Sequence, residues 1–320
     1  MVDQFERHIH YLRVSVTDLC NLKCQYCMPE DGIAKKDHQD ILRIEEYLQL
    51  IEEMVELGVD KVRLTGGEPL VRRGIVDLVK GIGKMDGVKD LAITTNGVLL
   101  KKYAKDLKDA GLTRVNISID TLDPNKYREI TRGGNIEDVL GGIEEARSVG
   151  LLPIKLNVVL INGFNTDEVE DFIKLADDDM DVRFIELMPF GQVANWSKDK
   201  FISNEVIFNR HRERFMTEPE EQYGPAKYYE KKDGHGRVGF INAISSHFCA
   251  TCNRVRLTAD GKLKLCLHTN EEFDLKPLLG LDSATIQESL QSYIMTKPER
   301  HHMNDQGFVP IIRDMNRIGG

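Results

Sequence analysis

The 320-residue sequence lacks several features, and each absence excludes a class of protein. It has no apolar run near the roughly 20 residues that a membrane-spanning helix needs, so we expect no membrane protein. It has no basic excess, since its formal charge is −9. This charge argues against a general nucleic-acid-binding protein. Its first seven residues are charged and have no apolar core. We therefore expect no signal peptide and a cytoplasmic location.

The sequence also lacks scattered cysteines. All six fall in two short triplets, one near each end of the chain. A disulfide framework is disfavoured in a chain without a secretory signal, whereas tight cysteine groups in a cytosolic protein indicate metal centres. The ligands expected at the two centres are Cys20, Cys24 and Cys27, and then Cys249, Cys252 and Cys266.

The first triplet has the spacing CxxxCxxC and directly follows an expected strand at 11–17. Three thiolates on a four-iron cluster would leave one iron free to bind another ligand. Structural zinc is the alternative for this site. Zinc would need a fourth ligand, and the nearest histidines, His8 and His10, lie beyond the expected strand.

Strands and helices alternate about six times in the first 190 residues. Helical spacing of apolar residues covers 44–57 and 75–85, and apolar–polar alternation is typical of the strands. This order predicts parallel βαβ units with right-handed crossovers. The expected strands are 11–17, 61–65, 91–95, 114–120, 153–161 and 182–188.

Each expected strand has one apolar face and one polar, partly cationic face. On the polar face lie Arg13, Arg63, Asn116 and Lys155, whereas neighbours such as Val14 are apolar. Closed eight-stranded barrels fill their interior with Val, Ile and Leu, so a polar interior predicts a partial, open (β/α)6-type barrel with a ligand-holding lumen. The alternative is an open sheet with one solvated face, but parallel sheets are normally covered on both faces.

Two loops follow the carboxyl ends of the first two strands, where ligands bind in parallel β/α folds. One is the cysteine loop, and the other is Gly66-Gly67-Glu68-Pro69. Glycines let the backbone approach a ligand closely, and Glu68 could hold an amine. Both loops are expected at the same mouth of the barrel.

The composition shifts near Pro189, so we expect a barrel domain at 1–190 and a smaller domain at 191–320. A charged helix at 203–215, a loop at 218–224 and a strand at 237–244 precede the second triplet. The turn Ala259-Asp260-Gly261 predicts a hairpin that brings Cys266 beside Cys249 and Cys252.

Zinc is a more serious alternative at this second site, where His247 or His268 could complete a Cys₃His set. Arg254 and Arg256 favour a cluster instead, because they lie on one strand face just past the cysteines. A structural zinc knot has no need of these two cations. A phosphorylated ligand at an open iron would need them.

The first triplet, with Tyr26 at its aromatic position, and the GGEP stretch resemble the radical S-adenosylmethionine (SAM) enzymes. In that superfamily SAM chelates the open iron of a 4Fe–4S cluster. The resemblance implies SAM contacts for Tyr26, Gly67, Glu68, Ser118 and Met188.

Nearly the whole chain resembles one family in that superfamily, the GTP 3′,8-cyclases of molybdenum cofactor biosynthesis. The resemblance rests on both triplets, on Asn253-Arg254-Val255-Arg256 and on the terminal Gly319-Gly320. Leu19 stands where the family usually has Arg. The resemblance to this family implies a lyase reaction in which a 5′-deoxyadenosyl radical removes the 3′ hydrogen of GTP and the ribose radical closes on guanine C8.

The same resemblance implies two 4Fe–4S clusters, with guanine at the second, and a Gly-Gly end that enters the active site. It gives Arg254, Arg256, Gly319 and Gly320 roles in catalysis. The residues expected to contact GTP are Arg13, Arg63, Thr94, Lys155, Arg254, Val255 and Arg256.

The family also implies a homodimer, a flavodoxin- or ferredoxin-type electron donor, and cyclic pyranopterin monophosphate synthase as the next enzyme. Two other functions stay open from the residues themselves. One is a radical SAM peptide-modifying enzyme with an auxiliary cluster, which would not need the Arg254–Arg256 pair or the Gly-Gly end. The other is a non-enzymatic zinc protein.

Overall fold

A computed structural model describes residues 1–33, 37–216, 224–246, 248–303 and 311–319. Its strands form one sheet in the order β11-β10-β9-β1-β2-β3-β4-β5-β6-β8-β7. They are β1 (Tyr11–Ser15), β2 (Lys61–Thr65), β3 (Asp90–Thr95), β4 (Arg114–Ser118), β5 (Ile154–Leu160), β6 (Met180–Glu186), β7 (Ala226–Glu230), β8 (Arg237–Ile241), β9 (Arg254–Leu257), β10 (Lys262–Lys264) and β11 (Phe273–Asp274).

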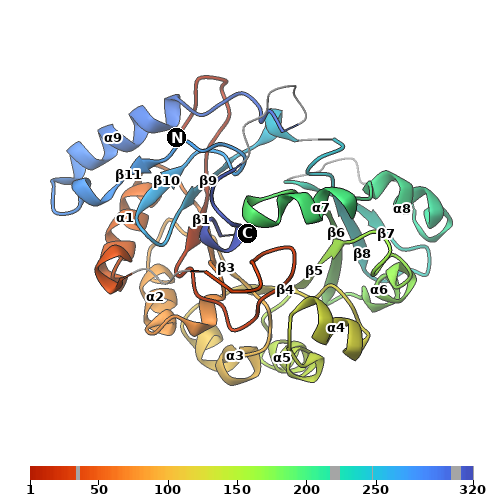
Figure 1. Ribbon diagram of the computed structural model, residues 1–320. Coiled ribbons are helices and arrows are strands. Elements are labelled where there is room, and N and C mark those ends of the chain that lie inside the picture. The colour runs from red at the N-terminus through yellow and green to blue at the C-terminus, as the bar shows by residue number, and fades with distance from the viewer. Residues whose placement is uncertain (34–36, 217–223, 247, 304–310, 320) are drawn as a thin grey trace.

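Helices follow the central strands in turn and lie on the outer side of the curved sheet (Figure 1). Their apolar faces pack on that sheet, as Tyr47, Leu50, Ile51 and Met54 of the first helix do. The helices are α1 (Ile44–Glu56), α2 (Ile75–Ile82), α3 (Leu100–Asp109), α4 (Pro124–Ile130), α5 (Ile136–Ser148), α6 (Val169–Leu175), α7 (Ala194–Asp199), α8 (Asn204–Arg210) and α9 (Ser283–Met295).

Strands β1 to β6 are parallel neighbours, which confirms the predicted partial barrel. Leu12 and Val14 are fully buried on the helix side, whereas Arg13 lies on the other side and pairs in register with Arg63. Strands β11 and β7 stand at opposite edges of the sheet, so the barrel is open. The alternation of residue types in the strands thus correctly predicted a polar lumen.

The C-terminal part of the chain extends this same sheet at both edges. Strand β9 pairs parallel with β1, and β10 pairs antiparallel with β9. At the other edge, β8 pairs parallel with β6, and β7 pairs antiparallel with β8. The hairpin predicted for the second cysteine triplet is therefore present and lies directly beside the first strand. The domain boundary near residue 190 stays a prediction.

The helix expected at 203–215 is shorter than predicted. Ser203 caps α8 by accepting a hydrogen bond from the backbone N–H of Glu205, and the helix ends at Arg210. The chain then turns through a short 3-10 segment, which places Phe215 against Tyr229 and Phe240. Packing of Phe215 in this aromatic group ends the helix early. Nearly all of the expected loop at 218–224 lies outside the described residues.

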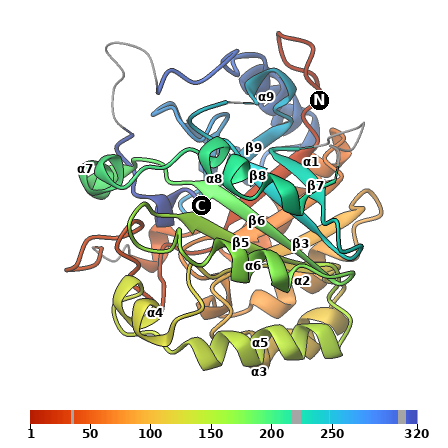
Figure 2. The same cartoon turned by 90° about the vertical axis from the view of Figure 1, so that its right-hand side faces the viewer.

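The C-terminal segment reaches the middle of the barrel, as Figures 1 and 2 show. A small apolar cluster, separate from the main core, holds this segment through Phe190, Ile311 and Ile318. Across the described ranges, no helix has both the length and the apolar character to cross a membrane.

Candidate active site

The cysteine loop and the GGEP loop pack tightly against one another. The backbone N–H of Gly67 donates to Thr17 O (2.8 Å), and that of Glu68 donates to Leu19 O (2.8 Å). Gly66 has φ 150°, and a Cβ there would lie 2.5 Å from Thr17 O. A Cβ on Gly67 would overlap Leu19 O. Glycine is required at both positions because the backbones of the two loops lie too close together to leave room for a Cβ.

Glu68 is fully buried behind the wall of the site. Its Oε1 accepts hydrogen bonds from Thr95 Oγ1 (2.7 Å) and the Leu70 N–H (2.9 Å), and its Oε2 accepts one from the Asn96 N–H (2.7 Å). Burial raises the pKa of this carboxyl to about 7. In the described structure Glu68 therefore joins the ends of β2 and β3, and the SAM contact expected for it stays a prediction.

Two residues that the sequence reasoning missed hold the cysteine loop in place. Asn96 Nδ2 donates to Asn21 Oδ1 (2.8 Å) and lies 3.8 Å from Cys20 Sγ. On the other side of the loop, Tyr26 Oη donates to Asp120 Oδ2 (2.7 Å). Burial raises the pKa of Asp120 to about 6. Both partners come from the carboxyl ends of later strands, a position that could have indicated them.

The second triplet surrounds the start of β9 and the end of β10. Arg7 Nη1 donates to Cys249 O (2.9 Å), and the buried Lys297 donates to Arg254 O (3.0 Å) and to Leu265 O. Arg7 and Lys297 come from the two ends of the chain. No local sequence signal could have placed them here.

All six cysteines are free, and all six line a single cavity of about 340 Å³. In the part of the chain that the structure describes, no three His, Cys, Asp or Glu side chains form a site for a single metal ion. In a four-iron cluster each cysteine binds its own iron, so the donor set fits a cluster. His268 and His247 were the possible fourth ligands for zinc. Nε2 of His268 lies 3.4 Å from Met188 Sδ, and His247 is outside the described residues.

Five arginines line the cavity between the two triplets: Arg13, Arg63, Arg183, Arg254 and Arg256. Burial, together with the charge of neighbouring guanidinium groups, lowers the pKa of Arg63 to about 10 and that of Arg256 to about 10. Burial and the charge of Arg256 lower the pKa of Arg13 as well. Clustered buried cations are unfavourable without a counter-charge, so the site favours an anionic ligand.

Several buried polar atoms of this cavity have no hydrogen-bond partner among the described residues. They are Thr94 Oγ1, Asn157 Oδ1, Arg63 Nε and Arg183 Nε. Buried polar atoms are normally satisfied, so these four indicate a polar ligand. Arg183 and Asn157 were not predicted as site residues, although both lie on the polar faces of β6 and β5, where alternation could have indicated them.

Not every predicted residue faces the cavity. Tyr26, Gly67, Ser118 and Met188 do. Lys155 instead forms an ion pair with Asp181 (2.9 Å) and lies over the ring of Tyr228. Val255 is buried in the core between two cavity-lining arginines.

The Gly-Gly end was predicted to enter the site, and Gly319, with φ 70°, contacts two arginines that line the cavity. Its carbonyl oxygen accepts hydrogen bonds from Arg13 Nη2 (3.0 Å) and Arg256 Nη1 (2.7 Å). A Cβ on Gly319 would overlap Thr65 Oγ1. Glycine is therefore needed here both for its backbone conformation and for its small size. Gly320 is outside the described residues.

Comparison with known proteins gives the family. Residues 14–176 match the Radical SAM superfamily, and residues 180–303 match the family Molybdenum Cofactor Synthesis C. The chain is 56% identical to the GTP 3′,8-cyclase of Alkaliphilus oremlandii and 53% identical to that of Alkaliphilus metalliredigens, with all of each chain covered. The chain belongs to the GTP 3′,8-cyclase family.

A more distant cyclase, from Listeria monocytogenes, is 45% identical over 99% of this chain and 98% of the relative. Among solved structures, Streptococcus suis SuiB bound to S-adenosylmethionine has a similar fold, with a TM-score of 0.59 and 15% identity. That match covers 97% of this chain and 77% of SuiB. As a GTP 3′,8-cyclase family member, the chain has SAM and two 4Fe–4S clusters as cofactors, and the two free cysteine triplets fit the clusters.

Proposed function

We propose that this chain is a lyase that converts GTP into 3′,8-cyclo-7,8-dihydro-GTP, the first step of molybdenum cofactor biosynthesis. The observation that carries the proposal is a single cavity lined by both cysteine triplets and by five arginines. Such a cavity can hold two ligands side by side, one at each triplet. The membership in the cyclase family supports the same reaction.

The protein residues divide into two groups. Cys20, Cys24 and Cys27 would hold the first cluster, beside which Tyr26, Gly67, Ser118 and Met188 would position SAM. When bound, the cluster and SAM supply a 5′-deoxyadenosyl radical that can remove the 3′ hydrogen of GTP. Cys249, Cys252 and Cys266 would hold the second cluster, beside which the guanine base would lie.

The arginines would bind the triphosphate, whose charge of roughly −4 must be balanced locally in an acidic protein. Among the described residues, Nε of Arg63 and Nε of Arg183 have no hydrogen-bond partner, and Arg254 lies over the ring of Phe248 (4.7 Å). Thr94 would contribute its hydroxyl, which also has no partner in the described ranges. The GTP contacts expected for Lys155 and Val255 stay predictions, because neither residue is among those that line the cavity.

We also propose the wider setting of the reaction. A flavodoxin- or ferredoxin-type protein would supply electrons, and cyclic pyranopterin monophosphate synthase would take the product. The chain would act in the cytoplasm as a homodimer. Residues 1–190 would form the SAM-binding unit and residues 191–320 the unit for the second cluster and GTP.

The test is anaerobic incubation of the reconstituted protein with GTP, SAM and a strong reductant, followed by mass spectrometry. We expect methionine, 5′-deoxyadenosine and a cyclised isomer of GTP. SAM cleavage with unchanged GTP would contradict the proposal and would favour the peptide-modifying alternative.

Replacing Arg254 or Arg256 by Ala is expected to weaken GTP binding. Each charge-assisted hydrogen bond to a phosphate oxygen contributes about 1.5–3 kcal/mol, so we expect a loss of roughly 10- to 150-fold. The affinity for SAM should barely change. Because Arg256 also binds the Gly319 carbonyl, its replacement should lower cyclisation more than replacement of Arg254 does. Equilibrium binding of both ligands measures these effects.

A matched control is Arg147→Ala. Arg147 lies on α5, away from the cavity, and pairs with Asp177 (2.8 Å). This variant should bind GTP like the parent protein. Equal losses for GTP and SAM in Arg254→Ala would show damage to the fold, and the assignment of Arg254 to GTP would then be wrong.

A further inference from the structure

The described C-terminal segment, residues 311–319, lines the cavity through Met315 and Asn316 and ends at Gly319. Gly319 binds Arg13 and Arg256, whereas Ile312, seven residues earlier, has a side chain that is 79% exposed. The position of Gly319 depends on the contacts that hold this segment. They include the buried hydrogen bond from Asn316 Nδ2 to Asp18 O (3.0 Å) and the contacts where the segment leaves the surface.

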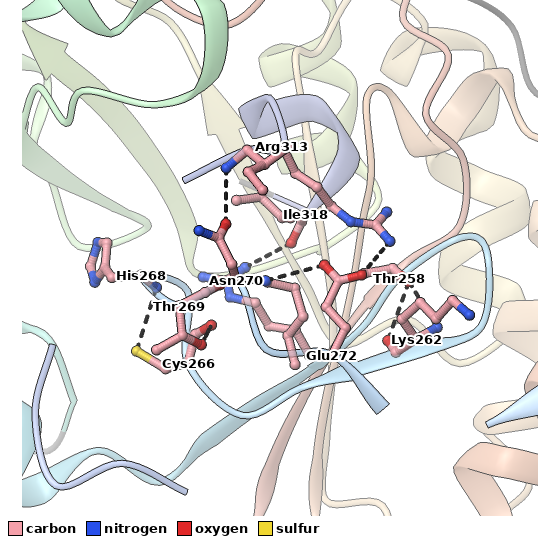
Figure 3. Close-up of polar contacts among 12 residues, drawn as sticks. Thr258, Lys262, Cys266, His268, Thr269, Asn270, Glu272, Arg313 and Ile318 are labelled. Carbon is pink, nitrogen blue, oxygen red and sulfur yellow. Dashed lines mark hydrogen bonds and ion pairs between the residues drawn. The ribbon is translucent and has the colours of Figure 1, made fainter. Parts of the chain in front are cut away.

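Arg313 is the charged contact at that point. Its Nη1 and Nη2 donate to the two carboxylate oxygens of Asp260, each at 3.0 Å, and Nη2 also donates to Glu272. The three side chains are only 15–18% exposed. Figure 3 shows Arg313 pointing toward Glu272 on the loop that follows Cys266. A planar guanidinium that binds a carboxylate through two bonds fixes orientation as well as distance.

The two carboxylates lie on the hairpin of the second triplet and on the loop that follows it. Asp260 lies in the hairpin turn and accepts a hydrogen bond from Thr258 Oγ1 (2.6 Å). Glu272 is held on its other side by the buried Lys264 (3.2 Å), which lies opposite Arg256 in the β9–β10 ladder. Contacts of Arg313 thus connect the C-terminal segment to the strand that carries Arg256.

A backbone contact supports the same connection. The N–H of Ile312 donates to Asn270 Oδ1 (2.9 Å), again from the loop after Cys266 (Figure 3). Between Arg313 and Gly319 the chain makes one short 3-10 turn, Met315–Arg317. The apolar contacts of Ile311 and Ile318 are non-directional, so they hold the segment near Phe190 without setting its register.

We propose that Arg313 is a positioning residue for cyclisation, which places the Gly319 carbonyl at Arg13 and Arg256 by holding the C-terminal segment on the Asp260–Glu272 pair. The inference rests on the proposed function, because it assigns the segment a part in cyclisation. The contact itself is remote from the reacting atoms, so Arg313 acts through the segment and not on the substrate.

The test compares Arg313→Gln, Arg313→Lys and the neighbouring control Ile312→Ala in the full-length, reconstituted protein under anaerobic conditions. Hydrogen exchange of the C-terminal peptide is measured without ligands. The amides of Arg317 and Ile318 report on the segment, because both donate hydrogen bonds in the 3-10 turn. GTP cyclisation, SAM cleavage and iron content are measured on the same samples.

We expect Arg313→Gln to speed exchange at Arg317 and Ile318 and to lower cyclisation by about 10- to 100-fold, in keeping with loss of the charge-assisted bonds to two carboxylates. SAM cleavage should fall less, and iron content should not change. Arg313→Lys should recover part of the loss, because it keeps the charge without the planar fork. Ile312→Ala should match the parent protein.

The inference is overturned if Arg313→Gln exchanges and cyclises like Ile312→Ala, or if faster exchange leaves cyclisation unchanged. If Arg313→Gln loses iron, the test uses Glu272→Gln instead, which removes one of the two carboxylates. This variant should also speed exchange and lower cyclisation, but by less. A parent protein that makes no cyclised GTP would contradict the proposed function alone. Unchanged exchange in both variants would then contradict the anchoring by Arg313 separately.

Discussion

Gly319→Ala is expected to reduce GTP cyclisation by at least about 100-fold while the iron content stays the same. The added Cβ would overlap Thr65 Oγ1 and approach Ser15 Cβ to 3.3 Å, in a residue with φ 70°. Left-handed backbone at a non-glycine residue costs ~1–3 kcal/mol, and overpacking costs about as much again. The C-terminal segment would leave the cavity, so Arg13 and Arg256 would lose the Gly319 carbonyl. Mass spectrometry of the products measures the loss.

A matched control is Gly280→Ala. Gly280 also has a positive φ, 85°, but it is exposed, and no described heavy atom lies within 4 Å of a Cβ built there. This variant introduces the backbone strain without the overlap, so it should cyclise GTP normally. Full activity in Gly319→Ala, or in a protein that carries a purification tag after Gly320, would show that the end of the chain has no part in the reaction.

Removal of either cysteine triplet should have an equally large effect, with different results for the two sites. The reconstituted parent protein should contain about eight irons and eight sulfides, from one cube per ligand set. Replacing Cys20, Cys24 and Cys27 by Ala should abolish SAM cleavage. Replacing Cys249, Cys252 and Cys266 should leave about four irons and some SAM cleavage, because only the first triplet lies beside the GGEP loop.

Iron, sulfide and zinc analysis of anaerobic preparations measures the metal content of all three proteins. Each triple variant serves as the control for the other, since both remove three half-buried thiols from the same cavity. Stoichiometric zinc together with full activity in the parent protein would contradict the assignment of two clusters.

Much of the fold could be predicted because local patterns reflect local constraints. The strand at Lys61–Thr65 agrees at both ends, and the first helix differs by one residue, because alternation and helical spacing both record which side chains are buried. The end of α8 was predicted incorrectly because Phe215 packs against Tyr229, a contact that forms only in the folded chain.

The polar atoms of the site were harder to predict than its cysteines. The spacing of the cysteines in the sequence indicates that they are ligands. Asn96 and Asp120 are ordinary residue types, and their role depends on their contacts with the cysteine loop. Lys155 was predicted from a polar face of β5, yet its ammonium group pairs with Asp181 on the next strand. Which cations keep free donors is decided by neighbours that lie far away in the sequence.

By itself, the sequence determined the two cysteine triplets, the glycines beside them, the alternating faces of the barrel strands and the family resemblance. These features are local, because each depends on the residue types within a short stretch of chain. Only the tertiary structure decided that both triplets share one cavity, that Glu68 joins two strand ends, and that Arg313 holds the C-terminal segment on Asp260. Those contacts join residues tens to hundreds of positions apart, and the pairing of β9 with β1 brings the second cysteine triplet beside the first strand.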